Sequence, residues 1–322
     1  MTASGLPAGR PPRIGAGVSG PPGQQRIWSA GRPVDIAATL GPLRRGAGDP
    51  AHQITADGFW RAANTPDGAA TLLLRRVSQG VHATAWGPGA RWALESVPDL
   101  LGANDDWSGL RLPDHPALAR ALRNRPGLRL PRTGLVFDSV VPAILEQRVT
   151  GTEARRAWRE LLRQFGTPAP GPHPWLRVPP DPAAILDVPV WTWHRLGVDQ
   201  QRVRAIRAAA TVARRLDDGA QLPLEEAVRR LRHVPGIGEW TAAEVAQRAL
   251  GHPDLVSVGD FHLHDLVVYA LSSRPRGDDT MMLTLLAPWI GQRQRVVRLI
   301  ELSGFRKPRF GPRYTPQDMR GF

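Results

Sequence analysis

The segment Val234–Ala242 (VPGIGEWTA) lies between two stretches of helical periodicity and has the residue types of a phosphate-binding turn. Pro235 ends the first helix, because the residue before a proline avoids the α region. Gly236 and Gly238 permit positive φ and carry no Cβ, so the turn can press against a partner, and Ile237 can fill the groove between the helices. The outward amides can then hold an anion such as a DNA phosphate. An ordinary tight turn is the alternative, but a string of this length favours a helix–hairpin–helix.

A carboxylate stands at the start of the next predicted helix, which covers 261–271. Asp260 follows Val256–Gly259 and is a good N-cap, and that role alone would explain it. At the positive end of a helix the carboxylate stays ionised at neutral pH, so it could also stabilise a cation that develops on a substrate. His262 and His264 are close by, but residues two apart on a helix point in different directions. We therefore expect no metal site from side chains.

The composition favours an acidic polymer as partner. The chain has 322 residues, 42 Lys+Arg against 29 Asp+Glu, a formal charge of +13 and a single lysine, Lys307. The isoelectric point near 11.5 points most simply to nucleic acid. The absence of cysteine excludes disulfides, thiolate zinc sites and cysteine-ligated iron–sulfur clusters. No uncharged apolar run reaches the roughly 18 residues of a membrane span, and no signal-peptide core is present, so we expect a cytoplasmic protein without membrane contact.

The pattern along the chain predicts two folded parts between two tails. Residues 1–25 are rich in Gly and Pro and are expected to be disordered, and 306–322 to form a basic tail. Residues 26–112 have short strand-like runs around the turn 65–68, which predicts a small α+β domain on an antiparallel sheet. Residues 113–305 have helical periodicity and predict an all-α bundle. Its helices are expected near 116–122, 139–164 (broken near 150), 182–186, 199–216, 224–233, 239–250, 261–271 and 279–302.

The hairpin, with an aspartate about twenty residues after it, resembles the helix–hairpin–helix/Gly-Pro-Asp superfamily of DNA glycosylases. Within it, the chain is most similar to the AlkA-type 3-methyladenine DNA glycosylases over roughly 30–305. The resemblance implies an α+β fold: a mostly α-helical helix–hairpin–helix core preceded by a small domain built on an antiparallel sheet. The further stretches that resemble the family are Phe137–Ser139, Ala143–Val149, Leu196–Ile206, Pro288–Trp289 and the closing helix to Phe305.

The resemblance also implies roles for single residues. Asp260 matches the catalytic aspartate, which stabilises an oxocarbenium-like sugar as a damaged purine leaves. Trp240 stands where glycosylases with lyase activity carry a nucleophilic lysine, so the expected enzyme is monofunctional. The Trp240 ring could instead stack on an everted base, or it could pack at the hairpin. The phosphate grip would come from the hairpin, with the Val234 carbonyl helping a bound monovalent cation and no other cofactor. The residues expected to form this phosphate-binding hairpin are Val234, Gly236, Ile237, Gly238 and Thr241.

Two departures from the family concern the DNA-facing turn and the pocket. Base excision takes the nucleotide out of the stack, and a protruding side chain normally fills the gap. Arg148 stands at this wedge position, where relatives often have an apolar residue, and Gln147 is the safer candidate for a groove or base contact. His262 is expected to line the pocket. Where the AlkA type has a Trp-Tyr pair, this chain has Ile300 and Glu301, and Glu301 is either buried near a cationic base or on a solvated helix face.

The sequence therefore predicts a monofunctional DNA glycosylase that hydrolyses the N-glycosidic bond of flipped-out alkylated purines in base excision repair. Its partner is double-stranded DNA with damaged bases, and we expect a nucleoid-associated monomer. The alternative is a non-catalytic helix–hairpin–helix DNA-binding protein. Asp260 discriminates between the two, because a pure binder has no use for a carboxylate that repels phosphate. A descendant of the methyl-transferring regulators is a weaker option, since their reactive cysteine is missing.

Overall fold

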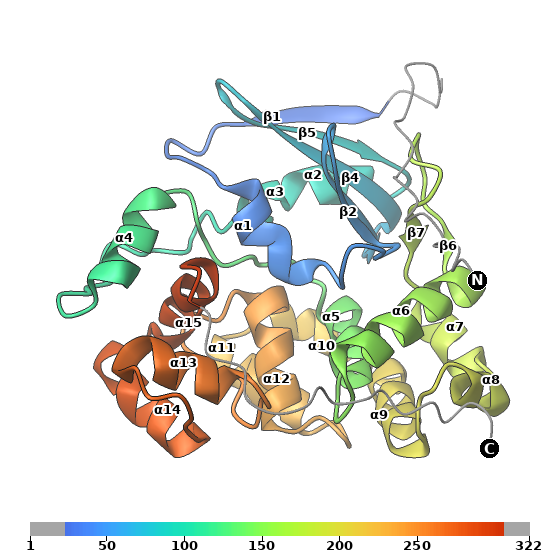
Figure 1. Ribbon diagram of the computed structural model, residues 1–322. Coiled ribbons are helices and arrows are strands. Elements are labelled where there is room, and N and C mark those ends of the chain that lie inside the picture. The colour runs from blue at the N-terminus through green and yellow to red at the C-terminus, as the bar shows by residue number, and fades with distance from the viewer. Residues whose placement is uncertain (1–22, 306–322) are drawn as a thin grey trace, which may run out of the picture.

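The computed structural model describes residues 23–305, in which a sheet lies against a larger set of helices (Figure 1). The predicted disordered tail (1–22 of it) and basic tail (306–322) lie outside the described residues. The five-stranded sheet is antiparallel throughout, in the order β1-β5-β4-β3-β2. Its strands are β1 (Gln24–Trp28), β2 (His52–Thr55), β3 (Gly58–Thr65), β4 (Gly68–Val77) and β5 (Gly80–Trp86).

Alternating side chains give the sheet two buried faces. On β4, Leu72 and Leu74 pack on one face, which α2 (Ala90–Glu95) and α3 (Val97–Leu100) cover, while Leu73 packs on the other face with Leu176. This is the period of two expected of a strand. The short β6 (Thr167–Pro168) and β7 (Arg177–Val178) form a second, two-stranded sheet.

Strand β1 corrects the predicted extent of the disordered segment. Gln24 and Gln25 were assigned to it, yet they pair with Ala85 and Thr84 of β5. The side chains from Gln24 to Ile27 are exposed, so the strand has no apolar pattern to detect. Backbone hydrogen bonds to an existing sheet edge are enough to place it.

The helical part is built around α5 (Val136–Leu145), in which every residue is buried except Asp138, which is partly buried. Helices α6, α9, α10 and α12 contact it, so α5 is the centre of the larger core. The remaining helices are α1 (Ile36–Leu40), α4 (Pro116–Asn124), α6 (Gly151–Phe165), α7 (Pro182–Asp187), α8 (Val190–Arg195), α9 (Gln200–Thr211), α10 (Ala213–Asp218), α11 (Leu224–Arg232), α12 (Glu239–Val245, continued by a π-helical turn Ala246–Leu250), α13 (Leu263–Ser272), α14 (Asp279–Leu286) and α15 (Arg293–Leu302).

The predicted helix over 279–302 is wrong as a single element. Helix α14 ends at Leu286, a 3-10 turn follows over Ala287–Trp289, and α15 begins at Arg293. Pro288 cannot donate to a continuing helix, and Gly291 has φ +89°. Likewise, the predicted helix over 199–216 divides into α9 and α10. The α+β fold class is confirmed, and within residues 23–305 no helix is long and apolar enough to cross a membrane.

Candidate active site

The hairpin between α11 and α12 is an exposed turn on a buried apolar base. The Ile237 amide donates to the Val234 carbonyl at 3.0 Å, and both side chains are buried in the core that contains α5 and α9. Pro235, Gly236, Gly238 and Glu239 are exposed at the tip. Ile237 therefore fills the space between the helices, and the backbone around it is free to meet a ligand.

The two glycines of the hairpin have different roles. Gly236 has φ +88°, and a Cβ built on it would lie 2.4 Å from the Cβ of Ala205 in α9. Gly238 has φ −85° and ψ −173°, an extended conformation open to any residue, and a Cβ there would meet nothing within 4 Å. Of the two glycines predicted to permit a positive φ, only Gly236 adopts one, because the chain reverses at Gly236. Because Gly238 has no side chain, no Cβ projects from the outer face of the hairpin at this position.

Unpaired amides gather at this outer face. Within the described residues, no protein acceptor pairs with the amides of Gly238, Glu239 and Trp240, which begin α12. Such amides attract an anion, as does the positive end of the helix. The Thr241 hydroxyl lies deeper: its side chain is buried and accepts a hydrogen bond from Gln147. As placed, Thr241 supports the turn from beneath rather than facing a phosphate.

Gln147 ties the turn between α5 and α6 to the hairpin. Its Nε2 donates to the Gly236 carbonyl at 2.9 Å and to the Thr241 Oγ1 at 2.8 Å. Both amide hydrogens are therefore engaged, and only Oε1 is left for the base or groove contact that the sequence predicted. The adjacent Arg148 is exposed and has φ +55°, which is rare outside glycine. The structure thus brings the predicted wedge turn and the predicted phosphate grip together.

The Asp260 carboxylate accepts three hydrogen bonds from the protein. Its Oδ1 accepts from the amides of His262 (2.8 Å) and Leu263 (2.9 Å), and its Oδ2 accepts from the Trp240 Nε1 at 3.2 Å. Helix α13 begins at Leu263, two residues later than predicted, because the aspartate caps the turn that precedes it. Trp240 belongs to the first turn of α12, so the carboxylate is joined directly to the helix that carries the hairpin.

The surroundings of Asp260 are open. The aspartate is partly exposed, His262 is exposed, and the Phe261 side chain is 80% exposed, with its ring 4.9 Å from that of His262. The His264 ring faces back to the Asp260 carbonyl at 2.9 Å. Sequence reasoning did not single out Phe261; its signal was a large apolar residue directly after a capping aspartate, on the solvent side of the turn.

Comparisons with known proteins agree with this architecture. No family model matches the chain. It is 28% identical over 172 residues to the probable bifunctional transcriptional activator/DNA repair enzyme AlkA of Mycobacterium tuberculosis (52% of this chain, 32% of that protein). It is 29% identical over 147 residues to DNA-3-methyladenine glycosylase 2 of Escherichia coli (45% and 52%). The chain thus matches about a third to a half of the length of these curated relatives.

Solved structures extend the likeness to the whole fold. The 3-methyladenine DNA glycosylase of Archaeoglobus fulgidus superposes with a TM-score of 0.71 over 88% of this chain and 99% of its own, at 17% identity. The chain thus shares the fold of this 3-methyladenine DNA glycosylase and is similar in sequence, over about half of its length, to the relatives named AlkA and DNA-3-methyladenine glycosylase 2. The 8-oxoguanine glycosylase/lyase of Clostridium acetobutylicum, in complex with DNA, has a TM-score of 0.64 at 9% identity, covering 84% and 91% of the two chains.

The closing helix carries the two residues, Ile300 and Glu301, that the sequence analysis singled out as a departure from the family it resembles. Ile300 is fully buried in the core. Glu301 has a side chain 38% exposed and is ion-paired with Arg298 one turn earlier. Of the two interpretations of Glu301, the structure supports a solvated helix face.

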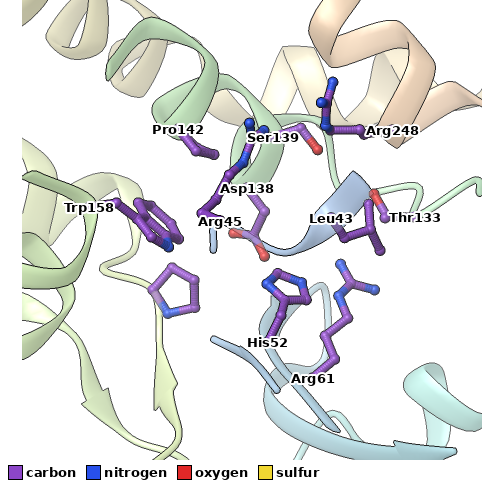
Figure 2. Close-up of a pocket in the computed structure, with 11 residues that line it drawn as sticks. Leu43, Arg45, His52, Arg61, Thr133, Asp138, Ser139, Pro142, Trp158 and Arg248 are labelled. Carbon is purple, nitrogen blue, oxygen red and sulfur yellow. The ribbon is translucent and has the colours of Figure 1, made fainter. Parts of the chain in front are cut away.

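A small polar cavity lies at the junction between the sheet and α5, away from the hairpin. Figure 2 shows Asp138 and Ser139 of α5 opposite His52 and Arg61 of the sheet. Its volume of about 30 Å³ suits roughly one water molecule and no nucleobase. Burial raises the pKa of the Asp138 carboxyl to about 7, although the Arg61 guanidinium opposes the rise. In the described part of the chain, no group of three or more His, Cys, Asp or Glu could hold a metal ion.

Proposed function

We propose that the protein is a DNA glycosylase that hydrolyses the N-glycosidic bond of alkylated purines in double-stranded DNA, as a step of base excision repair. The observation that carries this proposal is the hydrogen bond from Trp240 to Asp260. It joins the carboxylate to the first turn of the helix whose exposed amides form the hairpin. A DNA strand held at the hairpin would therefore run close to a fixed negative charge.

The carboxylate is suited to meet a cationic transition state. An ionised carboxylate has about four lone-pair sites, and three protein N–H groups bond to that of Asp260. One site on Oδ2 is left to face the reacting centre. As the bond to the base breaks, positive charge develops on the deoxyribose, and a preformed negative charge lowers the energy of that state. A positively charged alkylated purine is already a good leaving group and needs no strong general acid.

The remaining groups fit the steps before and after bond cleavage. The hairpin amides would hold a phosphate, and Arg148 at the tip of its turn would enter the space left by the extruded nucleotide. His262 and the Trp240 ring are the candidates for contact with the base. Trp240 cannot form a Schiff base, and the single lysine of the chain, Lys307, lies outside the described residues. These residues support hydrolysis without strand cleavage.

The hairpin is also compatible with the monovalent cation that the resemblance implies. The Val234 carbonyl accepts one hydrogen bond, from Ile237, and so keeps a second lone pair. Such an ion would add positive charge under the phosphate; the hydrolysis itself does not need it. That the protein is a monomer and that it associates with the nucleoid stay predictions.

The test is base release from methylated duplex DNA by the parent protein and by Asp260→Asn. Asparagine keeps the shape and the acceptor for the His262 and Leu263 amides but removes the charge. We expect DNA affinity to be retained and excision to slow by two to three orders of magnitude, about 3 kcal/mol or more of transition-state stabilisation. Excision at the parental rate by Asp260→Asn would refute the catalytic role.

DNA binding is tested separately through its dependence on salt. The logarithm of the affinity for undamaged duplex should fall with the logarithm of salt concentration, with a slope of about 0.9 per phosphate neutralised. A flat dependence would contradict DNA binding and with it both the glycosylase and the non-catalytic alternative. A parent protein that binds DNA with the expected salt dependence but releases no base from any methylated duplex would favour the non-catalytic DNA-binding protein.

A further inference from the structure

The segment that carries Asp260 has no regular secondary structure of its own. Residues 251–262 connect the π-helical turn after α12 to α13 without a helix or strand. The position of the carboxylate therefore depends on what holds this segment. Electrostatic stabilisation requires that the charge be preorganised, because a displaced charge must move during the reaction.

Ser257 is the buried polar anchor of the segment. Its side chain is 3% exposed, and its Oγ donates to the Glu244 Oε1 at 2.6 Å and accepts from the Gln247 Nε2 at 2.9 Å. The same Nε2 donates to the Leu255 carbonyl at 3.0 Å. A hydroxyl bonded to an ionised carboxylate makes a short, strong hydrogen bond, so the orientation of Ser257 is determined on both sides.

The anchor transmits its position to Asp260 through the backbone. The Asp260 amide donates to the Ser257 carbonyl at 3.2 Å, which closes a turn between the two residues. On the opposite side, the amide of Gly259 donates to the Asp279 Oδ2 of α14 at 3.0 Å. The aspartate is thus carried by a turn whose first residue is fixed to α12 and whose third is fixed to α14.

The side chains of α12 and its π-helical continuation that hydrogen-bond this segment come from one stripe of the helix. Trp240, Glu244 and Gln247 are four and three residues apart, the spacing that places side chains on one helix face. Trp240 bonds the carboxylate itself, and the other two bond Ser257. The hairpin at the start of α12 and the turn that carries Asp260 are therefore both attached to the same helix, which fixes their positions relative to each other.

Glu244 can take part without an uncompensated buried charge. Its Oε2 lies 2.8 Å from the Arg248 Nη1, and the Arg248 Nε donates in turn to the Pro42 carbonyl at 3.0 Å. The ion pair leaves Oε1 available to Ser257. A buried carboxylate that is paired and hydrogen-bonded is the arrangement that a low-dielectric site tolerates.

We propose that Ser257, held by Glu244 and Gln247, is a positioning residue that sets the distance and orientation of the Asp260 carboxylate relative to DNA bound at the hairpin. This inference rests on the proposed function. Ser257 lies beneath the turn and is buried, so it acts through Asp260 and touches no substrate. Loss of the hydroxyl should displace the carboxylate while the hairpin stays in place.

The experiment compares Ser257→Ala with Ser139→Ala. The control removes another buried serine hydroxyl, which belongs to α5 and donates to the carbonyl of Leu135, the residue before the helix. Substrate is duplex DNA treated with dimethyl sulfate, and the released methylpurines are measured by chromatography. We expect Ser257→Ala to lower kcat by about tenfold to a hundredfold, the range for a misplaced catalytic group. KM and the affinity for undamaged duplex should not change, and Ser139→Ala should retain the parental kcat.

A double-mutant cycle separates positioning from general destabilisation. If Ser257 acts only through the charge of Asp260, Ser257→Ala causes no further loss in the Asp260→Asn background. An equal loss in both backgrounds, or parental kcat in Ser257→Ala, would overturn the inference while leaving the proposed function intact. A parent protein without base release would instead remove the proposed function and this inference with it.

A second variant covers the case in which Ser257→Ala does not fold, as judged by circular dichroism. Gln247→Met deletes one of the two bonds to Ser257 at similar side-chain volume. It should show the same pattern with a smaller loss of kcat, and again no loss in the Asp260→Asn background. Parental kcat in a folded Gln247→Met protein would count against the network as the positioning device.

Discussion

Replacing Gly236 with alanine should destabilise the protein, while the same change at Gly238 should not. The two glycines are two residues apart in the same hairpin, so the pair is internally controlled for position and chemistry. At Gly236 the backbone has φ +88°, where an L-residue costs about 1–2 kcal/mol. The new Cβ would also lie 2.4 Å from the Ala205 Cβ, whereas carbon atoms in contact sit about 3.5–4.0 Å apart.

The clash adds to the backbone strain because neither partner can move freely. Ala205 is buried in the middle of α9, so relief requires a shift of that helix or of the hairpin by about 1 Å, and overpacking of this kind costs typically 1–3 kcal/mol. The free energy of unfolding should therefore fall by about 2–5 kcal/mol. At Gly238, φ −85° suits alanine and the Cβ meets nothing within 4 Å. The change should stay within about 1 kcal/mol, the cost of alanine at an N-cap.

Urea denaturation of the parent, Gly236→Ala and Gly238→Ala measures these differences directly. Affinity for duplex DNA, measured by fluorescence anisotropy, then tests the role of the outer face. The Cβ of Gly238→Ala would stand where a phosphate approaches, so this variant should bind more weakly while remaining as stable as the parent. Equal stability losses in the two variants would refute the assignment of the close contact with α9 to Gly236 alone.

Three further outcomes are expected. The Asp138 carboxyl has a pKa of about 7 in the folded protein against an ordinary 3.8. Between about pH 4 and pH 7 this carboxyl stays protonated in the folded protein but ionises in the unfolded chain. The free energy of unfolding should therefore fall by up to about 4 kcal/mol over this range. Asp138→Asn should flatten this fall in urea titrations, and an unchanged pH profile would contradict it. Gln147→Ala removes the donor to the Gly236 carbonyl and should weaken duplex binding by about 1 kcal/mol in anisotropy titrations; undiminished affinity would show that the tie is dispensable. Trp240→Phe removes the N–H bonded to Asp260 and should slow base release about tenfold, the effect of losing a bond to a charged group, and parental rates would refute this.

Short-range patterns in the sequence were sufficient for most of the elements. The string Val234–Ala242 folds as predicted into a turn between two helices, because a proline that ends a helix and a glycine that reverses the chain act on their immediate neighbours. The turn 65–68 likewise produces the hairpin of β3 and β4. The α+β fold class and the resemblance to AlkA-type glycosylases follow from these local signals together with the placement of Asp260.

Where the structure of a segment depends on contacts with a distant segment, the local sequence pattern either gave no prediction or gave a wrong one. Strand β1 has exposed side chains and is held by the edge of a sheet formed far along the chain. The predicted helix over 279–302 has apolar periodicity throughout, yet α14 ends at Leu286, and Pro288 and the positive φ of Gly291 turn the chain so that α14 and α15 both contact α13. Gly238 matched the motif as well as Gly236 did, and only the position of α9 distinguishes them.

By itself, the sequence determined which residue types are available for a phosphate grip and a nearby carboxylate, because backbone preferences and helical periodicity operate within a few residues. Only the tertiary structure decided their partners: the bond from Gln147 to the hairpin, the bond from Trp240 to Asp260 and the anchoring of Ser257 by Glu244. A polar side chain can satisfy its hydrogen bonds in many ways in an isolated segment. Its actual partner is set when packing of the apolar faces brings distant segments together and excludes water from around it.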